Sequence, residues 1–437
     1  MQTKTEAGRP TVKHAPIEAS NDFGGWGWSM IIFSGLMYYM YAAWTADGLN
    51  VFISSFAKEK GWDPAKLLVL ATPANWIGVL GAMVFGQMIM KAGPRLVTVV
   101  AMFFAGASVI WFGRVDSITD YMFALAAIAF FTTGYGFVVP GTLMNIWFPR
   151  KKGLALGWAT MGMPVCTATF VYVMSFMFKE FGFVNTYTIS GAFLIALSLI
   201  AWFWIKDTPE SVGCFPDNVR FSHENMAATI EKMKNYQSPF TVAKLLRDKD
   251  MWCISLGYGC LWLVTIGIVS QYVLRLISLG YTEETAINML AVAAVCALPG
   301  SYLWGWLDLK WGTKKASVVY TATYIVILGC LVYEGGPVFT FITSVLVGSG
   351  LAGIKELITS MTGSVYGRYD FAAANRVITP IANILRASTF VVMGMSLMLT
   401  KSYSGAYLIF IVINIIGLVL ISKITNECKG NDLEVDD

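Results

Sequence analysis

The chain has 437 residues, of which 56% are hydrophobic and 13% are charged, and its mean hydropathy is +0.61. A globular protein of this length needs more polar side chains to cover its surface, so the composition excludes an ordinary soluble protein and indicates an integral membrane protein. The net charge of +4 matters less than the positions of the charges, and we expect no nucleic-acid partner.

The N-terminal segment is polar and of mixed charge. It contains no basic stretch leading into a short apolar run with a cleavage site, so we expect a cytoplasmic tail over 1–25 rather than a signal peptide. The seven cysteines are scattered without a Cys-x-x-Cys pair, and most fall within apolar runs. This pattern predicts neither disulfides nor a metal site, and we expect no cofactor.

Twelve apolar segments follow the tail, each long enough to cross the roughly 30 Å of a bilayer core as a helix. A polar segment over 206–250, predicted to be a cytoplasmic loop, separates the first six from the last six. The pattern predicts an all-α membrane protein with two six-helix bundles, over 26–205 and 251–424, and a cytoplasmic tail over 425–437. The predicted spans are 27–56, 65–89, 96–113, 120–146, 153–178, 184–205, 251–278, 284–308, 316–333, 338–364, 376–400 and 404–422.

The basic residues are unevenly divided between the two sets of loops. Of the 31 Lys and Arg residues, 22 lie in the tails, the central loop and the loops at 90–95, 147–152, 309–315 and 365–376, and six lie on the other face. Cytoplasmic loops are enriched in Lys and Arg. We therefore predict a multi-pass protein of the cell (inner or plasma) membrane with both termini in the cytoplasm.

The two halves contain the same loop motif after their second apolar segment. An offset of 219 residues sets GQMIMKAGPR over GWLDLKWGTKK without gaps, and an offset of 214 sets GYG at 134–136 over GSG at 348–350. Repeated halves are typical of transporters that rock two bundles around a central site, whereas chance matching of glycine-rich sequence is the alternative. The first offset aligns Gly61 with Gly280, Gly86 with Gly305, Lys91 with Lys310, Gly93 with Gly312 and Arg95 with Lys314.

The six-plus-six layout and the paired basic loops resemble the major facilitator superfamily, from about residue 27 to residue 424. Two segments, WFPRKKGLALGWATMG at 147–162 and DTPESVGCFPDN at 207–218, are similar to the oxalate:formate antiporter and monocarboxylate-porter branches. The resemblance implies twelve helices in two pseudo-symmetric bundles, with spans one, four, seven and ten lining a central cavity.

The resemblance also implies gating at the two loops. The aspartate usual in the family's loop is replaced by Met90 in one half and Leu309 in the other, with Asp308 one residue earlier. Arg275 lies shortly before Gly280, the predicted external turn, so we expect it at the external mouth in a gating or snorkelling role. The loop cations expected to take part in gating are Lys91, Arg95, Lys310 and Lys314.

Few charged side chains lie at membrane depth. Placing a charge at a helix centre costs at least about 2.5–3.5 kcal/mol, so such residues normally face the bundle interior and bind a partner or a substrate. Four of them fall on spans that the resemblance places at the cavity, and the fifth falls on span eleven. They are Asp47, Arg275, Lys355, Glu356 and Arg386.

Lys355 and Arg386 are the candidate ligands for a carboxylate. Lys355 is about seventeen residues into span ten and Arg386 about ten into span eleven, so at 1.5 Å per residue both are expected near the midplane. Lys355 and Glu356 are adjacent and point about 100° apart, so we assign Lys355 to the cavity and Glu356 to a neighbouring helix, with the reverse still open. The related antiporter branch has a cationic carboxylate anchor in span eleven; that place falls on Asn383, one turn before Arg386.

A second set of residues suggests a different ligand. Tyr41 and Trp44 lie within a turn of Asp47, and a carboxylate beside two aromatic rings suits a protonated amine. Ordinary packing is the alternative for these aromatic residues, and Tyr135 in span four is a weaker candidate of the same kind. Asp47 is also a candidate proton carrier.

Other chemistries lack their residues. His14 and His223 fall in predicted cytoplasmic segments, and no phosphate-binding G-x4-G-K-[ST] loop occurs, so we expect neither an enzyme nor an ATP-driven pump. We predict a monomeric secondary active transporter of a small organic anion of the carboxylate class, coupled to protons or a counter-substrate. The alternatives are a carrier of zwitterions or amines and a membrane receptor or scaffold that does not transport.

Overall fold

The structure is a computed structural model and describes residues 22–218, 236–333 and 335–430. Throughout these residues the chain forms helices joined by short turns, without any strand, and the predicted all-α fold is confirmed. The predicted tail 1–25 lies almost entirely outside the described residues, as do His14, His223 and the last residues of the predicted tail 425–437.

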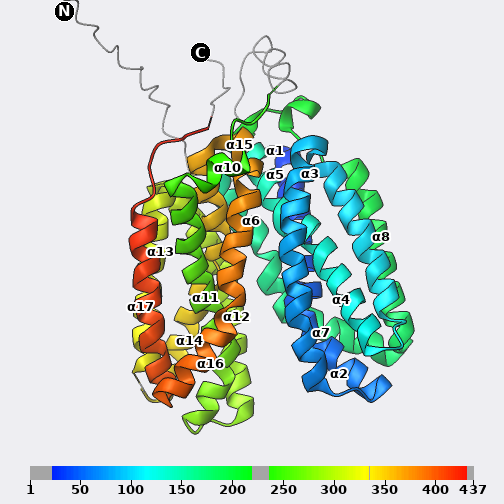
Figure 1. The fold of residues 1–437 in the computed structure, drawn as a ribbon, viewed down its shortest axis with the longest axis vertical. Coiled ribbons are helices and arrows are strands. Elements are labelled where there is room, and N and C mark those ends of the chain that lie inside the picture. The colour runs from blue at the N-terminus through cyan, green and yellow to red at the C-terminus, as the bar shows by residue number, and fades with distance from the viewer. Residues whose placement is uncertain (1–21, 219–235, 334, 431–437) are drawn as a thin grey trace, which may run out of the picture.

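The N-terminal half forms one bundle, drawn in blue to cyan and green in Figure 1. Span one is interrupted by one π-helical turn, and so is span four. Spans two and three form one element that turns back on itself. The elements are α1 (Gly24–Ala42), η1 (Ala43–Asp47), α2 (Gly48–Lys60), α3 (Pro64–Phe112), α4 (Ile118–Thr133), η2 (Gly134–Val138), α5 (Val139–Trp147), α6 (Lys152–Thr160), α7 (Gly162–Phe181) and α8 (Phe183–Trp204).

The C-terminal half forms the second bundle, drawn in green to red. Short helices η3 (Pro209–Val212), η4 (Pro216–Asn218) and α10 (Val242–Leu246) belong to the segment between the bundles. Spans ten and eleven run through α14, α15 and α16. The elements of the second bundle are α11 (Lys249–Ser278), α12 (Glu283–Trp311), α13 (Thr313–Val332), α14 (Pro337–Leu351), α15 (Ile354–Ala387), α16 (Thr389–Thr400) and α17 (Tyr403–Ser422).

Two reversals of the chain are made by a single glycine. Gly93 has φ 78° and Gly367 has φ 75°, a left-handed conformation that glycine adopts without steric penalty. The predicted loop over 365–376 is therefore wrong, because the helix resumes directly after Gly367. The segment was predicted to be a loop because it contains polar residues. In the structure these residues have partners: Asp370 accepts a hydrogen bond from Tyr236, and Arg376 donates one to Gln87 on α3.

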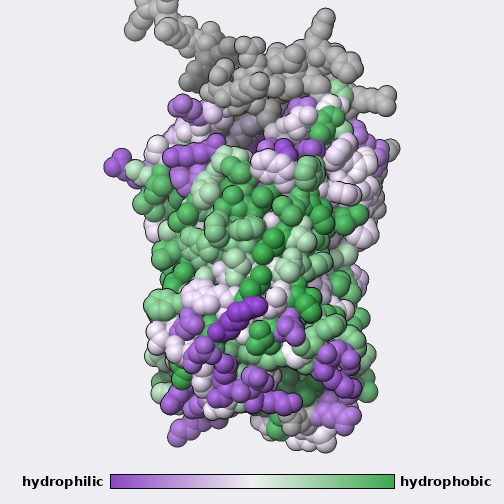
Figure 2. All heavy atoms as spheres, turned by 90° about the vertical axis from the view of Figure 1, so that its right-hand side faces the viewer, coloured by the Kyte–Doolittle hydropathy of each residue, from purple (hydrophilic) through white to green (hydrophobic). Residues whose placement is uncertain are grey.

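The outer surface matches a bilayer. Among the described residues, nine helical stretches are long and apolar enough to cross a membrane, and two of these, Pro73–Phe112 and Pro337–Ala387, contain two crossings each. Figure 2 shows a hydrophobic band between more polar ends on the face formed by the N-terminal bundle. Exposed apolar side chains of α8 such as Phe193, Leu199 and Phe203 suit contact with lipid.

The two bundles meet at one end of the molecule, which we call the terminal end because Gly93, Gly367 and the last described residues lie there. Figure 1 shows the bundles converging at this end and diverging toward α2 and α16, the distal end. Helix α12 packs against α6, and α15 packs against α3 and α5. The approach is close at Gly157, where an added Cβ would lie 2.9 Å from the Ser301 carbonyl oxygen. The structure is therefore closed at the terminal end.

The core of the N-terminal bundle is aromatic. Phe56 on α2 lies at the centre of a cluster whose ring centroids are 4.9–5.9 Å from its own. Aromatic rings in edge-to-face and stacked contacts add to the stability gained from apolar packing. The five neighbours of Phe56 are Trp62, Phe112, Tyr121, Phe183 and Tyr187.

The core of the C-terminal bundle uses hydroxyl pairs instead. Tyr258 and Ser317 hydroxyls lie 2.5 Å apart, and Tyr272 and Ser344 hydroxyls lie 2.7 Å apart. Buried hydroxyls are costly without a partner, so these pairs fix which helix faces which. The two halves thus share a fold but differ in what joins their helices.

Candidate functional site

Lys355 reaches from the C-terminal bundle to the N-terminal bundle. Its Nζ donates a hydrogen bond of 3.1 Å to the Phe137 carbonyl oxygen and lies 3.2 Å from the centroid of the Phe137 ring. The side chain is 5% exposed, and no carboxylate among the described residues lies within 4.0 Å of it. A buried cation without a counter-ion is expensive, so this position favours an anion.

A break in span ten places this lysine near a helix start. Helix α14 ends at Leu351, and α15 begins at Ile354 after Gly353, whose φ is 63°. The Tyr320 and Tyr324 hydroxyls donate to the Gly350 carbonyl oxygen at 2.6 and 2.7 Å, which satisfies the end of α14. Broken helices in transporters direct the positive ends of half-helices at anionic groups, and Lys355 adds a full charge in the first turn of α15.

The π-helical turns η1 and η2 lie on the facing side of this region. A π turn contains an extra residue and disturbs the regular carbonyl ladder, and such turns occur often at functional sites. Turn η2 supplies the Phe137 carbonyl that receives Lys355, and η1 ends at Asp47. The turns are neighbours, because the Tyr41 ring lies 5.2 Å from the Phe137 ring and Tyr41 packs against Gly136.

Arg386 is the second cation of this region. Its guanidinium carbon lies 5.3 Å from the Trp262 ring centroid of α11, and it is close enough to Lys355 to act on that charge. Asn383, one turn earlier on α15, is buried. Because span eleven begins after Gly367 rather than at 376, Arg386 lies about 28 Å along its helix from that turn, and Lys355 lies about 18 Å from it on the other side.

Asp47 is held by span five. Its Oδ2 accepts a 3.0 Å hydrogen bond from the Thr167 hydroxyl of α7, and its side chain is half-buried. Trp44 instead stacks on Phe52 at 5.1 Å within the bundle core and is 2% exposed. The structure thus brings Tyr41 to the Lys355 region but turns Trp44 away from it.

The side chain of Glu356 lies at the junction of the bundles and points away from the side chain of Lys355. Its Oε2 accepts a 3.2 Å hydrogen bond from the Thr160 hydroxyl of α6, while its Oε1 has no hydrogen-bond partner among the described residues. The side chain is 1% exposed, and Asp308 lies close enough to repel it. The carboxylate therefore joins span ten to span five at the closed end.

Two further candidates lie inside single bundles. Arg275 is buried in the C-terminal bundle, where it donates to the Leu331 carbonyl oxygen and lies 5.7 Å from the Tyr407 ring centroid. It also lines a cavity at the distal end together with Lys401. Tyr135 is fully buried in the N-terminal core.

The loop cations lie at the terminal end. Arg95 donates through Nε to the Trp202 carbonyl oxygen at 2.6 Å, and its backbone N–H donates to Asp207. Lys310 lies 4.6 Å from the Trp306 ring centroid, Lys314 lines a cavity between the bundles, and Lys91 is exposed. Of the four, only Lys314 lines the cavity between the bundles, and Arg95 is bound to other parts of the N-terminal half.

The sequence did not reveal three residues that contact the Lys355 region or the junction of the bundles. Phe137 acts through its backbone carbonyl, which leaves no signal except the glycines of GYGF. Arg376 was assigned to a loop, although a cation facing the GQM segment of the repeated motif is a usable signal. Thr160 had none, because a hydroxyl in an apolar helix usually bonds its own backbone.

A multi-pass membrane transporter is the class that this fold and its charged centre define. Residues 27–388 match the family model of the Major Facilitator Superfamily, which covers most of the chain. The protein therefore belongs to the major facilitator superfamily, whose members are transporters of small molecules and not enzymes.

Curated relatives with names that describe transporters match the chain at low sequence identity. Monocarboxylate transporter 9 of Rattus norvegicus is 23% identical over 227 residues, which are 50% of this chain and 43% of that protein. The probable galactarate/D-glucarate transporter GudP of Escherichia coli is 21% identical over 368 residues, 76% of this chain and 81% of its own. The chain thus spans less than half of the rat relative.

A solved structure has the same fold. The major facilitator transporter FucP in its outward conformation superimposes with a TM-score of 0.67 and 15% identity, covering 91% of this chain and 99% of its own. At this identity the similarity establishes the fold alone.

Proposed function

We propose that the protein is a secondary active transporter of a small organic anion, in which Lys355 and Arg386 bind the carboxylate. The transport mode is alternating access, as an antiporter or a proton symporter. The protein acts as a monomer in the cell membrane with both termini cytoplasmic, so that the closed terminal end faces the cytoplasm. The positive-inside distribution of Lys and Arg supports this orientation.

One observation carries the proposal. Lys355 is buried, crosses between the bundles and binds a backbone carbonyl instead of a carboxylate. A second cation, Arg386, lies within its electrostatic range, so the region holds two like charges. An anion that binds between the two cations lowers the free energy of these buried charges.

The named relatives support the substrate class. The names of the rat and E. coli relatives both refer to transport of organic anions, a monocarboxylate in one case and galactarate or D-glucarate in the other. An amine site at Asp47 has less support, because Trp44 packs into the core and leaves Tyr41 as the nearer aromatic residue. Asp47 remains the proposed proton carrier of a symport mode, with a hydroxyl rather than a cation as its partner.

Binding tests the carboxylate assignment. A panel of mono- and dicarboxylates, amino acids and amines is screened for thermal stabilisation of the purified protein, and the best compound is used for flux into proteoliposomes. We expect a carboxylate to bind and to exchange. Arg386→Lys keeps the charge but loses the planar fork and should bind less tightly. Lys355→Gln should weaken binding about 10- to 100-fold, the size of one charge-assisted hydrogen bond.

The matched control is Lys423→Gln, an exposed lysine after α17 that should leave binding unchanged. A correctly folded Lys355→Gln, Arg386→Gln double variant that still transports the carboxylate with normal affinity would contradict the anion site. Binding without countertransport in the native protein would favour the receptor alternative.

A further inference from the structure

A cavity at the terminal end is separate from the Lys355 region. It has a volume of about 490 Å³ and is lined by both bundles. The N-terminal bundle contributes Arg150 and Lys152, and the C-terminal bundle contributes Lys314 and Lys315. The segment after α17 forms part of its wall through Thr425. This volume is within the range of small-molecule sites.

The charge of the lining is strongly positive. Four cationic side chains face one acidic residue, Asp308, among the described lining residues. Asp308 is 5% exposed, and its Oδ2 already accepts a 2.6 Å hydrogen bond from Ser360. The acid is therefore directed into the protein, whereas Lys314 is half-buried and Lys315 exposed. The accessible part of the cavity is cationic.

The backbone adds to this field. Helix α6 begins at Lys152 and α13 begins at Thr313, and both of these residues line the cavity. The start of α6 already binds a carboxylate, because Asp217 accepts hydrogen bonds from the Arg150 and Lys151 backbone N–H groups. The start of α13 has no side-chain cap, so its positive end lies beside the cationic side chains of the cavity.

We propose that this cavity binds an anionic phosphate group. Arginine offers a planar fork for phosphate oxygens, lysines act as point charges, and an uncapped helix start binds phosphate in the same way. The source is either a soluble phosphate compound or the headgroup of an anionic phospholipid.

Such a ligand acts on the conformation. The site exists only while α6 and α13 are held together, because its cations come from both bundles. A ligand that binds one conformation stabilises it according to its differential affinity. Phosphate binding therefore favours the state that is closed at the terminal end, and it slows opening on that side.

Two arms distinguish the sources. In the first, inorganic pyrophosphate is added to the full-length protein in detergent, with sodium chloride at equal ionic strength as the reference, and the thermal unfolding midpoint is recorded. In the second, the midpoint is compared in vesicles of zwitterionic lipid with and without phosphatidylglycerol. A shift in the first arm identifies soluble phosphate, and a shift confined to the second identifies the headgroup.

Matched variants locate the response. Lys314→Gln with Lys315→Gln should abolish the shift and weaken binding about tenfold or more. Lys310→Gln removes a neighbouring cation that lies against Trp306 outside the cavity and should keep the shift. Arg386→Gln should also keep it, which separates this site from the carboxylate site.

A conformational readout completes the test. Spin labels at Lys58→Cys on α2 and Glu284→Cys on α12, both exposed at the distal end, report the separation of the bundles there after exposed native cysteines are replaced. The effective ligand should increase the population with the longer distance. The proposal is overturned if neither arm shifts the midpoint, or if the Lys314→Gln, Lys315→Gln variant responds like the native protein.

Discussion

At the residue scale, Lys355 and Glu356 illustrate how adjacent charges take different partners. One binds the Phe137 carbonyl across the centre, and the other binds Thr160 at the closed junction. The sequence identified both as buried charges on span ten and predicted that they point apart. It could not identify the partners, because a backbone carbonyl and a helix hydroxyl carry no distinctive pattern.

Glu356→Gln should fold with an unchanged or higher thermal midpoint. A buried carboxyl with one hydroxyl partner and a repelling neighbour, Asp308, gains little from its charge, and the amide keeps its shape. Glu356→Ala should instead lower the unfolding free energy by about 1–3 kcal/mol, because it leaves a cavity at the buried junction, although the Thr160 hydroxyl keeps its bond to the Leu156 carbonyl oxygen. Thermal unfolding in detergent compares them; a large loss in the Gln variant would show that the negative charge itself stabilises the junction.

At the element scale, the helix count and order were predictable, whereas the breaks within helices were not. Apolar length located the spans, and the repeated motif located the turn at Gly93. The turn at Gly367 was extended into a loop because the following residues are polar. The π turns at 43–47 and 134–138 depend on packing between spans one and four, and no local sequence pattern within either span predicts that packing.

Closure depends on the near approach of α6 and α12. Gly157→Leu should prevent it, because a side chain there would meet the Ser301 carbonyl oxygen and Gly305. We expect the variant to favour the state that is open at the terminal end, measured as faster thiol labelling of a cysteine introduced at Thr160. Gly329→Leu is the control, since an added Cβ there has open space. Equal labelling in both variants would contradict this role for the glycine contact.

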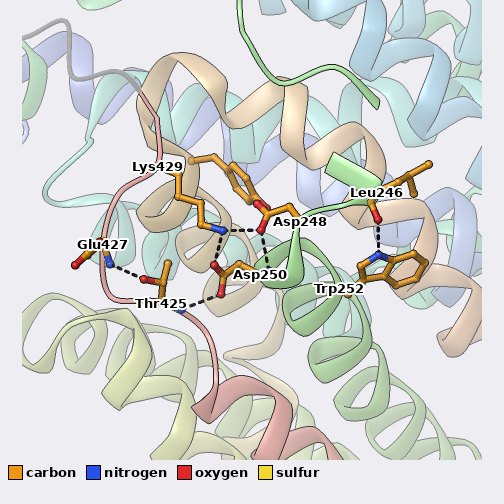
Figure 3. A network of polar contacts seen from close by, with 8 residues as sticks. Leu246, Asp248, Asp250, Trp252, Thr425, Glu427 and Lys429 are labelled. Atoms are coloured by element: carbon orange, nitrogen blue, oxygen red, sulfur yellow. Dashed lines mark hydrogen bonds and ion pairs between the residues drawn. The ribbon is translucent and has the colours of Figure 1, made fainter. Parts of the chain in front are cut away.

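The segment Thr425–Lys429, which we call the C-terminal segment, is tied to the start of α11. Figure 3 shows Lys429 between Asp248 and Asp250, with Nζ to carboxylate distances of 2.5 Å to each. Burial alone would raise the pKa of Asp248, but hydrogen bonds from Lys429 and Tyr366 outweigh burial and lower it. Burial alone would lower the pKa of Lys429, but the Asp248 and Asp250 carboxylates outweigh burial and raise it.

These shifts predict a pH window for the attachment. The lowered pKa of Asp248 stabilises the attachment at pH values above the carboxyl's unfolded pKa of about 3.9, and this stabilisation is lost as the pH falls through the folded pKa. The raised pKa of Lys429 stabilises the attachment below the unfolded lysine pKa of about 10.4, and this stabilisation is lost as the pH rises through the folded pKa. The C-terminal segment should therefore stay bound between about pH 4 and pH 10, measured by anisotropy of a dye on Cys428. Lys429→Met should release it throughout, and identical profiles would refute the assignment.

At the scale of the whole molecule, topology is accessible through two native thiols. Cys428 is exposed and Cys214 is partly exposed at the terminal end, so an impermeant thiol reagent should label them only in inverted vesicles. Burial raises the pKa of the Cys214 thiol, so it should react more slowly than Cys428. Labelling of either cysteine from outside intact cells would contradict the proposed orientation.

The unlike cores of the two bundles have a consequence for exchange between the halves. The halves keep the glycine turns Gly93 and Gly312 in register, yet one half packs rings around Phe56 and the other uses pairs such as Tyr258 with Ser317. The backbone reversals are shared, and the interior contacts differ. A core substitution tolerated in one half is therefore no guide to its counterpart, and chimaeras that exchange single helices between halves should fail even where the loops match.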